Sequence, residues 1–326
     1  MSKKDERYRA AIVGAGSIAA LYDSPRDRAV LTHAHAFRRH PKTDLVGICD
    51  IDSRASKKAA NRWSCAAYSD LDDMLIETRP DIVSVCTPDA DHVSTLLKVA
   101  KARPKLVICE KPVALDSRGL RQITDAYRKI PVLVNYTYRF TDKIRKIRDG
   151  IRAGTYGKVL TASALYTKGL RHNGSHAIDL GRYLFGDVIS VHALGKRNDY
   201  RKDDPSVSAV LAFRRCPEFH LMIGDAKHAF LMELDIICEK KRFRLVDVGF
   251  EITEQSVVRH PIYHAYSVMG PPVSASAGLD RSMLDMVDNA VRHLDRREAL
   301  ICTMGDAIST EAVCASLVKH APHSYV

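Results

Sequence analysis

Residues 10–19 read A-A-I-V-G-A-G-S-I-A, and this stretch decides the fold. Four apolar residues run directly into Gly14-Ala15-Gly16, the start of a match to G-x-G-x-x-G/A. The first glycine makes a tight turn, and the second lets the backbone approach a pyrophosphate. A small third residue lets the following helix pack on the sheet, and the N-terminus of that helix attracts phosphates. The stretch predicts a dinucleotide-binding loop, provided that strands and helices alternate around it.

Short aliphatic runs alternate with helical segments through the first 135 residues. The runs are Ala10–Val13, Leu45–Cys49, Ile82–Cys86, Leu106–Cys109 and Val132–Val134. Between them lie helix-period segments, each opened by an aspartate that can cap a helix: Asp52–Arg62, Asp70–Thr78, Asp91–Ala102 and Asp116–Lys129. Such alternation is typical of parallel β-α-β units, and continuous apolar strands are covered on both faces. We predict an α/β fold with an N-terminal Rossmann doubly wound parallel sheet.

Asp50 ends the second predicted strand, where the ribose hydroxyls of a dinucleotide bind. It lies farther from the glycines than the usual spacing of about 20 residues. We interpret the polar stretch Asp23–Arg28 as an inserted loop that explains the difference. A carboxylate at this position accepts a hydrogen bond from a 2′-hydroxyl and repels a 2′-phosphate, so we expect NAD rather than NADP. Arg54 nearby weakens this preference, and a loop-capping role is the alternative for Asp50.

The pattern changes after about residue 140. Helices are predicted over Asp142–Ala153 and Ser175–Phe185. Five extended runs have no regular crossover helices between them, which favours an antiparallel sheet; they are Val159–Thr167, Val188–Leu194, Val207–Phe213, Phe230–Cys238 and Phe243–Val248. Residues 270–278 are predicted as loop, followed by helices near Arg281–Arg296 and Gly305–Lys319. We place a dinucleotide-binding domain at residues 1–135 and a second domain at 136–326, whose last helix can pack back on the first.

Composition excludes several classes of protein. The 326 residues include 50 Lys and Arg against 39 Asp and Glu, a formal net charge of +11. These basic residues are dispersed in short groups without a ribonucleoprotein motif, so no nucleic-acid partner is expected, whereas an anionic small substrate is compatible with the charge. No apolar run reaches the roughly 18 residues that cross a bilayer. The charged start MSKKDERYR lacks a signal-peptide pattern, so no membrane partner is expected.

The eight cysteines form no C-x-x-C pair, and several end apolar runs, among them Cys49, Cys86 and Cys109. Cysteines in such runs are typical of buried free thiols, which predicts a reducing, cytoplasmic location. His33 and His35 have no third ligand nearby in the sequence. We therefore interpret them as residues on a helix surface and predict no metal site.

Three further segments follow predicted strands or open a helix. They are Thr87-Pro88-Asp89-Ala90-Asp91-His92, Glu110-Lys111-Pro112 and Gly174-Ser175-His176-Ala177-Ile178-Asp179-Leu180. In this order behind the glycine-rich loop, they resemble the glucose–fructose oxidoreductase/inositol dehydrogenase (Gfo/Idh/MocA) family over nearly the whole chain. The resemblance implies a C-terminal α/β domain with an open, mostly antiparallel sheet, which binds substrate and associates into homodimers or homotetramers. It also implies hydride transfer between a nicotinamide cofactor and a sugar, cyclitol or nucleotide-sugar hydroxyl or ketone.

Lys111 and His176 carry the proton chemistry in this interpretation. Oxidation of an alcohol needs a base for the hydroxyl proton, and Lys111 follows a parallel strand at the edge where α/β sheets bind ligands. Desolvation beside a cationic cofactor lowers the pKa of a lysine, which suits proton exchange. The resemblance implies a cis Lys111–Pro112 bond that aims the lysine into the cleft. His176 matches the family histidine that exchanges the proton or holds the hydroxyl, and Asp179 lies one turn later on the same helix face.

His172 departs from the family pattern. Many family dehydrogenases carry an aspartate four residues before the histidine, but this chain has His172. A neutral histidine accepts a hydrogen bond, whereas a charged one repels Lys111. We count His172 as a third catalytic candidate and leave the direction of the reaction open.

Other residues are predicted around the cofactor and the substrate. The cofactor contacts are Gly14, Gly16, Ser17, Ile18, Asp50, Thr87, Pro88, Glu110 and Lys111. The substrate contacts are Tyr138, Arg139, Asn173 and Asp179, with Lys168 and Arg171 on the same loop as Asn173. Arg139 has a hinge salt bridge as its alternative and Tyr138 a packed hinge aromatic. His92 is expected to be structural.

The sequence therefore predicts an NAD(P)-dependent oxidoreductase of sugar-like substrates. The alternative from another class is a non-catalytic dinucleotide-binding sensor or regulatory protein on the same fold. Reduction of an imine or a linear tetrapyrrole is a third possibility, which the combination of Glu110-Lys111-Pro112 with His176 and Asp179 disfavours.

Overall fold

The computed structural model describes residues 7–322, which divide into two units. The first contains the N-terminal residues up to Phe140 together with Asp280–Ile308, and the second contains Thr141–Leu279 and the residues from Ser309. The predicted ranges, 1–135 and 136–326, differ from these units in two places. Residues 136–140 and the segment 280–308 belong with the first unit.

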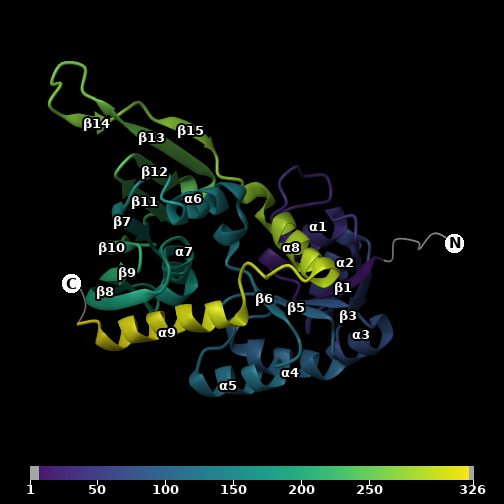
Figure 1. The fold of residues 1–326 in the computed structure, drawn as a ribbon. Coiled ribbons are helices and arrows are strands. Elements are labelled where there is room, and N and C mark those ends of the chain that lie inside the picture. Colours follow the sequence, from purple (N-terminus) through teal and green to yellow (C-terminus); the bar gives the residue numbers. More distant parts are fainter. Residues whose placement is uncertain (1–6, 323–326) are drawn as a thin grey trace. The chain divides into compact units, whose positions relative to one another are not determined.

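The first unit is built on a six-stranded parallel sheet with the order β3-β2-β1-β4-β5-β6 (Figure 1). Its strands are β1 (Tyr8–Val13), β2 (Thr43–Cys49), β3 (Ala66–Tyr68), β4 (Ile82–Val85), β5 (Leu106–Cys109) and β6 (Val132–Val134). Every residue of β4, β5 and β6 is buried, because helices cover both faces of the sheet. The Rossmann part of the predicted fold class is confirmed, and β3 is the strand that the sequence prediction missed.

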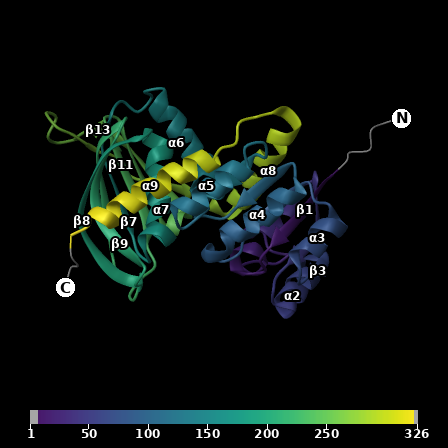
Figure 2. The same cartoon turned by 90° about the horizontal axis from the view of Figure 1, so that it is seen from below.

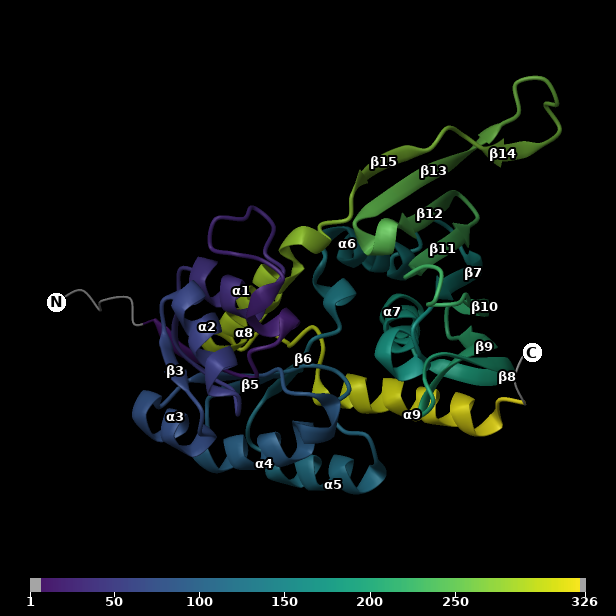
Figure 3. The ribbon, with the colours of Figure 1, turned by 180° about the vertical axis from the view of Figure 1, so that it is seen from behind.

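Six α-helices accompany this sheet. They are α1 (His33–Arg39), α2 (Ser53–Trp63), α3 (Leu71–Thr78), α4 (His92–Ala102), α5 (Ser117–Ala126) and α8 (Ser282–Arg296). Helices α1, α2 and α8 lie on one face, and α3, α4 and α5 lie on the other (Figures 1 and 3). Helix α8 joins this core through Met283, Met286 and Val287.

The predicted aspartate caps are confirmed at three of four helices. Asp52, Asp70 and Asp116 each accept a hydrogen bond from a backbone N–H in the first turn of α2, α3 and α5. Asp91 makes no such bond, because it belongs to a short 3₁₀ turn, Asp89–Asp91, that runs directly into α4.

The second unit is built on a mixed sheet with the order β14-β13-β12-β11-β7-β10-β9-β8, and β15 pairs with β13 (Figure 3). Figure 2 shows strands β7, β8, β9, β11 and β13 of this sheet from another side. Its strands are β7 (Val159–Tyr166), β8 (Val188–Arg201), β9 (Asp204–Phe213), β10 (Cys216–Ile223), β11 (Met232–Cys238), β12 (Lys241–Val246), β13 (Glu251–Arg259), β14 (Ser267–Met269) and β15 (Val273–Ser276). All neighbouring pairs are antiparallel except β7 with β10. The prediction of a mostly antiparallel sheet is confirmed.

Helices α6 (Asp142–Arg152) and α7 (Ser175–Phe185) belong to this unit, and α9 (Met304–His320) begins in the first unit and continues in the second. The prediction gives the bounds of α7 as the structure has them. Strands β10, β13 and β14 were not predicted, and the predicted loop at 270–278 is wrong for Val273–Ser276, which forms β15. Among the described residues, 7–322, no helix is both long and apolar enough to cross a membrane.

We predict that Ile12→Ala destabilises the first unit by about 2–5 kcal/mol, because Ile12 is fully buried in β1 and its truncation leaves a cavity. Ile51→Ala is the matched control, since Ile51 is 96% exposed and the same truncation there costs about 0.5 kcal/mol or less. Urea unfolding of the whole chain, followed by circular dichroism, measures both. Equal shifts of the unfolding midpoint in the two variants would contradict this view of the core.

Candidate cofactor and substrate sites

Gly14 turns the chain sharply at the end of β1. Its φ is +97°, a conformation that side chains rarely adopt, and its N–H donates to the Cys49 carbonyl at 2.7 Å. A Cβ at this position would lie 2.5 Å from the Cys86 carbonyl oxygen. Because neighbours on β2 and β4 both approach this residue, only glycine fits.

The segment after Gly14 departs from the expected strand–loop–helix pattern. Gly16 is exposed, and a Cβ built on it has no atom within 4 Å. The expected helix is only a five-residue π-helical turn, Ser17–Leu21, and α1 begins at His33 after a loop. The helix expected after the glycines is therefore only this short turn, and the N–H groups available to a phosphate are those of the loop and of the turn.

Asp50 holds this loop in place. One carboxylate oxygen, Oδ2, accepts the Ala15 N–H at 2.7 Å, and the other, Oδ1, accepts the Asp52 N–H at 2.9 Å. The carboxylate thus has the loop-capping role given above as the alternative. Each oxygen keeps a second lone pair, so these bonds leave room for ribose hydroxyls.

A cavity of about 280 Å³ opens beside these residues, lined among others by Gly14, Asp50, Thr87 and Pro88. It lies at the carboxyl edge of the sheet where β1 and β4 are neighbours and the strand order reverses, the usual ligand position in open α/β sheets. The hydroxyl oxygen of Thr87, Oγ1, is buried there and has no hydrogen-bond partner in the described part of the chain. A bound polar ligand would satisfy this hydroxyl, so the residues fit a dinucleotide.

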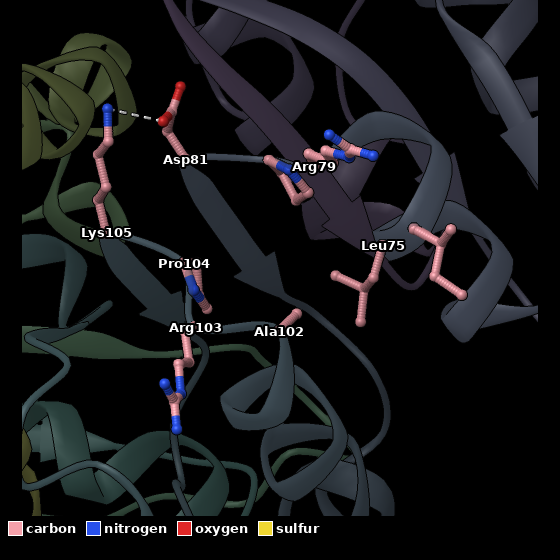
Figure 4. Close-up of a pocket in the computed structure, with 9 residues that line it drawn as sticks. Leu75, Arg79, Asp81, Ala102, Arg103, Pro104 and Lys105 are labelled. Carbon is pink, nitrogen blue, oxygen red and sulfur yellow. Dashed lines mark ion pairs between the residues drawn. The ribbon is translucent and has the colours of Figure 1, made fainter.

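A second hollow, of about 500 Å³, lies at the opposite edge, before the amino ends of β4 and β5 (Figure 4). Arg79, Arg103 and Lys105 line it, and Lys105 pairs with Asp81 at 2.9 Å. It contains none of the predicted site residues and lies at the edge where this fold class does not bind its ligands.

Glu110, Lys111 and Pro112 follow β5 at the same edge as Gly14. The Lys111–Pro112 bond is cis, as the resemblance implied, and Lys111 is half-buried. The Glu110 oxygen Oε1 accepts from Asn135 Nδ2 at 2.7 Å and lies 2.8 Å from His33 Nε2. Burial alone would raise the pKa of Glu110, but His33, Asn135 and the neighbouring Lys111 lower it below its ordinary value.

His33 corrects an expectation, because it lies in the core and not on a helix surface. It is fully buried, and its second ring nitrogen, Nδ1, lies 2.7 Å from Ser84 Oγ. Burial alone would lower the pKa of His33, but interactions with Cys86 and Glu110 raise it to about 10. His33 and Glu110 therefore form a buried pair directly before Lys111 in the chain, which sequence reasoning missed because the two partners are far apart in the sequence.

His35 is likewise buried and pairs with Asp23 at 2.8 Å. Asp23 also accepts from the Leu31 N–H and the Thr32 hydroxyl, so the inserted loop is tied back to the start of α1. Among residues 7–322, no group of three or more His, Cys, Asp or Glu side chains is arranged to hold a metal ion.

Tyr138 and Arg139, predicted as substrate contacts, and His92, predicted to be structural, are all engaged within the first unit. Arg139 is buried and pairs with Asp306 at 3.2 Å, which matches the alternative of a salt bridge. Tyr138 is also buried, and burial raises its pKa. The two ring nitrogens of His92 lie 2.6 Å from the Pro112 carbonyl and 2.9 Å from the Thr87 carbonyl. His92 thus ties together the loops that carry Lys111 and Thr87.

In the second unit, His172 and His176 lie one turn apart on consecutive helical segments. A π-helical turn, Leu170–Gly174, runs directly into α7, and both histidines are partly exposed. A Cβ on Gly174 would lie 2.5 Å from the Tyr166 ring, so this glycine lets the start of α7 pack closely on β7. The histidines are thereby fixed on a rigid element.

Asn173 and Asp179 make structural contacts in the second unit. Asn173 is buried, and its Nδ2 donates to the carbonyls of Thr167 and Leu231, both at 2.8 Å. Asp179 is buried and accepts from Thr310 Oγ1 at 3.3 Å. These bonds stabilise the loop before α7 and the contact between α7 and α9.

The chain is similar in sequence and in structure to known proteins. Residues 8–138 match the family model described as an oxidoreductase family with an NAD-binding Rossmann fold. Over this segment, the chain is similar to the Gfo/Idh/MocA oxidoreductases. The NAD-binding fold named in that description coincides with the sheet, the Gly14 turn and the cavity at Asp50.

One curated relative and two solved structures are similar to this chain. A D-glucoside 3-dehydrogenase of Escherichia coli is 29% identical over 198 residues, which cover 56% of this chain and 53% of that protein. The chain thus spans about half the length of this curated relative. A solved oxidoreductase of Agrobacterium radiobacter in complex with NAD⁺, L-tartaric acid and magnesium has a TM-score of 0.75 at 17% identity, over 97% of this chain and 96% of that one. The WlbA dehydrogenase of Bordetella pertussis in complex with NADH and UDP-GlcNAcA has a TM-score of 0.74 at 19% identity, over 97% of each chain. The TM-scores show that the two solved structures share the fold of this chain.

We predict that Gly16→Ala weakens NAD binding without affecting folding, whereas Gly14→Ala destabilises the folded protein. Gly16→Ala should fold with an unchanged melting temperature, because its Cβ meets no protein atom, and should bind NAD about tenfold more weakly, because the pyrophosphate needs that space. Gly14→Ala should lower the melting temperature without any ligand. Calorimetric titration with NAD and thermal unfolding measure the two effects. Undiminished NAD affinity in Gly16→Ala would contradict the assignment of the loop.

We predict that His33→Gln destabilises the protein more at pH 6 than at pH 10. A histidine with a raised folded-state pKa contributes stability that is fully present below its ordinary pKa of 6.5 and is lost as the pH rises through about 10. Melting temperatures of the variant and the parent protein at both pH values give the difference, and His220→Gln on the exposed side of β10 is the control. A penalty that does not change with pH would show that His33 is not charged.

Proposed function

We propose that the protein is an NAD(P)-dependent oxidoreductase that transfers a hydride between nicotinamide and a sugar, cyclitol or nucleotide-sugar hydroxyl or ketone. The observation that carries the proposal is the position of Lys111 at the same edge of the Rossmann sheet as Gly14 and the Asp50 cavity. The family match and the dehydrogenase name of the E. coli relative support it. The solved relative with NADH and UDP-GlcNAcA supports the inclusion of nucleotide sugars.

The cofactor is held, in this proposal, by the backbone from Gly14 to Ile18 and by Asp50, Thr87 and Pro88. Asp50 faces the ribose of the adenosine half, so NAD is preferred to NADP. Glu110 lies beside Lys111 as an ionised carboxylate and adds a hydrogen-bond acceptor. When bound, the nicotinamide takes or gives the hydride at its ring.

The protein's own residues handle the proton. In the oxidative direction, the O–H bond of the substrate breaks and its proton passes to Lys111 Nζ, while His176 holds the reacting oxygen and exchanges the proton with water. His172 is the third residue assigned to this chemistry, one turn before His176. Tyr138, Arg139, Asn173 and Asp179 act, in this proposal, as residues that shape the substrate pocket, and the contacts above support a positioning role for them.

Two further properties belong to the proposal. None of the eight cysteines forms a disulfide, which supports a reducing, cytoplasmic location. The sheet of the second unit exposes large apolar side chains, among them Leu160, Ile189 and Met222, which supports association into homodimers or homotetramers.

We predict that Lys111→Ala abolishes turnover while NAD affinity stays within about threefold, because the lysine takes the proton and is only one of nine predicted contacts with the dinucleotide. Turnover is measured as absorbance at 340 nm with NAD and NADP, in both directions, over sugars, cyclitols and nucleotide sugars. Lys129→Ala, which removes an exposed lysine after α5, is the control with the same change of charge.

Each outcome of this assay has a clear meaning. Turnover that depends on Lys111 establishes the dehydrogenase and identifies its substrate class. Turnover that survives in Lys111→Ala rejects the role of the lysine. NAD binding without turnover of any compound favours the sensor on the same fold.

A further inference from the structure

A loop in the second unit is held in an unusual conformation. It covers residues 167–174 and leads into α7, which carries His176. Lys168 has a φ of +75° and Gly169 follows with +81°, and a lysine in this region is strained. Such strain persists only where the surroundings enforce it, and it is concentrated at ligand-binding sites.

Two buried carboxylates enforce the conformation. Asp199 accepts the Lys168 N–H at 2.8 Å, and Asp204 accepts the N–H groups of Arg171 and His172 at 2.8 and 2.9 Å. A Cβ on Gly169 would lie 2.3 Å from Asp204 Oδ2, so the loop packs directly onto this carboxylate. The acids nearest to the loop therefore bind backbone N–H groups.

The cationic side chains of the loop have a different environment. Lys168 Nζ lies 5.4 Å from the ring centroid of Tyr200 and 5.6 Å from that of Phe230, so the ammonium is held between two aromatic rings. Within residues 7–322, neither Lys168 nor Arg171 forms an ion pair with a carboxylate. The loop thus presents a lysine ammonium held by two rings, and Arg171 adds a second cation, whose charge lowers the pKa of the buried Asp204.

The two rings remain accessible within the unit. Tyr200 is 40% exposed and Phe230 is 49% exposed. The His172 ring lies 4.9 Å from the Tyr200 ring, so this cluster of cations and rings reaches the segment one turn before His176. Aromatic faces beside fixed cations suit a ligand that carries both an anionic group and a flat or apolar ring.

We propose that Lys168 and Arg171, with the rings of Tyr200 and Phe230, form a subsite for a phosphate group attached to the sugar substrate. The inference rests on the proposed function for the sugar, but the anion subsite is testable without turnover. Two sources share this chemistry, a sugar phosphate and a nucleoside diphosphate sugar. The half-exposed rings fit the base of a nucleoside diphosphate sugar, and substitution of Tyr200 distinguishes the two sources.

The binding test uses uridine diphosphate and inorganic pyrophosphate as probes, in calorimetric titrations of the whole protein saturated with NAD. We expect Lys168→Ala and Arg171→Ala each to weaken binding of both probes by about tenfold or more, because each removes a charge-assisted contact. Lys202→Ala is the matched control, since it removes an exposed lysine two residues from Tyr200 and changes the net charge equally. Lys168→Arg, which keeps the charge, should retain most of the affinity.

Tyr200→Leu distinguishes the two sources of phosphate. If the ring stacks on a base, this variant weakens uridine diphosphate more than pyrophosphate, whereas Tyr200→Phe leaves both unchanged. Equal effects on the two probes assign the subsite to a sugar phosphate. Thermal unfolding of each variant confirms that it is folded.

The kinetic test compares glucose, glucose 1-phosphate and UDP-glucose, and equivalent series of other sugars, at 340 nm. We expect kcat/KM to be highest for phosphorylated members and Lys168→Ala to reduce it mainly through KM. Probe binding that is insensitive to Lys168 and Arg171, or turnover only of neutral sugars, overturns the subsite and leaves the proposed function intact. Probe binding that depends on both residues, without any NAD-linked turnover, supports the subsite and rejects the proposed function.

Discussion

The close contact of Gly14 with two neighbouring strands is the constraint on which the first unit depends. Its N–H is bonded to the end of β2, and its Cα faces the Cys86 carbonyl after β4 too closely for any Cβ. This contact fixes where β1 stops relative to its neighbours. As a result, the residues after all three strands, including Asp50 and Thr87, border one cavity. The position of this cavity is therefore a consequence of strand order.

In the second unit, buried side chains fix the conformation of the loop before α7. The loop 167–174 contains Gly169 and Gly174, and the buried carboxylates of Asp199 and Asp204, on the β8–β9 hairpin, hold it by binding its N–H groups. Burial raises the pKa of Asp204, and the N–H groups of Arg171 and His172 offset part of that rise. Hydrogen bonds between buried carboxylates and backbone N–H groups make the loop rigid. They also leave the loop's cationic side chains available to a ligand.

The parts of the fold that the sequence predicts are those with local causes. Continuous apolar runs identify β4 and β5, and Asp52 and Asp70 cap the helices that they open. The bounds of α7 follow from the change of pattern at Gly174 and Gly186, which flank the helix. Such signals need only a few neighbouring residues, so a single sequence contains them.

The parts that it misses have distant causes. The burial of His33 depends on Glu110, 77 positions away, and nothing near His33 in the sequence indicates this partner. Strand β15 is short and mostly exposed, so it has no apolar run, and it exists because β13 offers it a ladder of hydrogen bonds. The roles of Asp199 and Asp204 were likewise hidden, because their partners are backbone N–H groups that carry no sequence signature.

The presence of His172, where the family pattern has an aspartate, affects the net charge of the loop. An aspartate at this position would add a negative charge directly after Arg171, on a residue that neighbours the same Tyr200 ring as Lys168. The histidine leaves the segment from Lys168 to His172 without an acidic side chain, while the acids below it are committed to the backbone. A neutral polyol gains little from such a loop, whereas a phosphate group gains contacts with two cations. In the proposed function, His172 therefore removes an acid from a loop that carries two cations, which favours an anionic substrate, and it remains the third candidate for the proton chemistry.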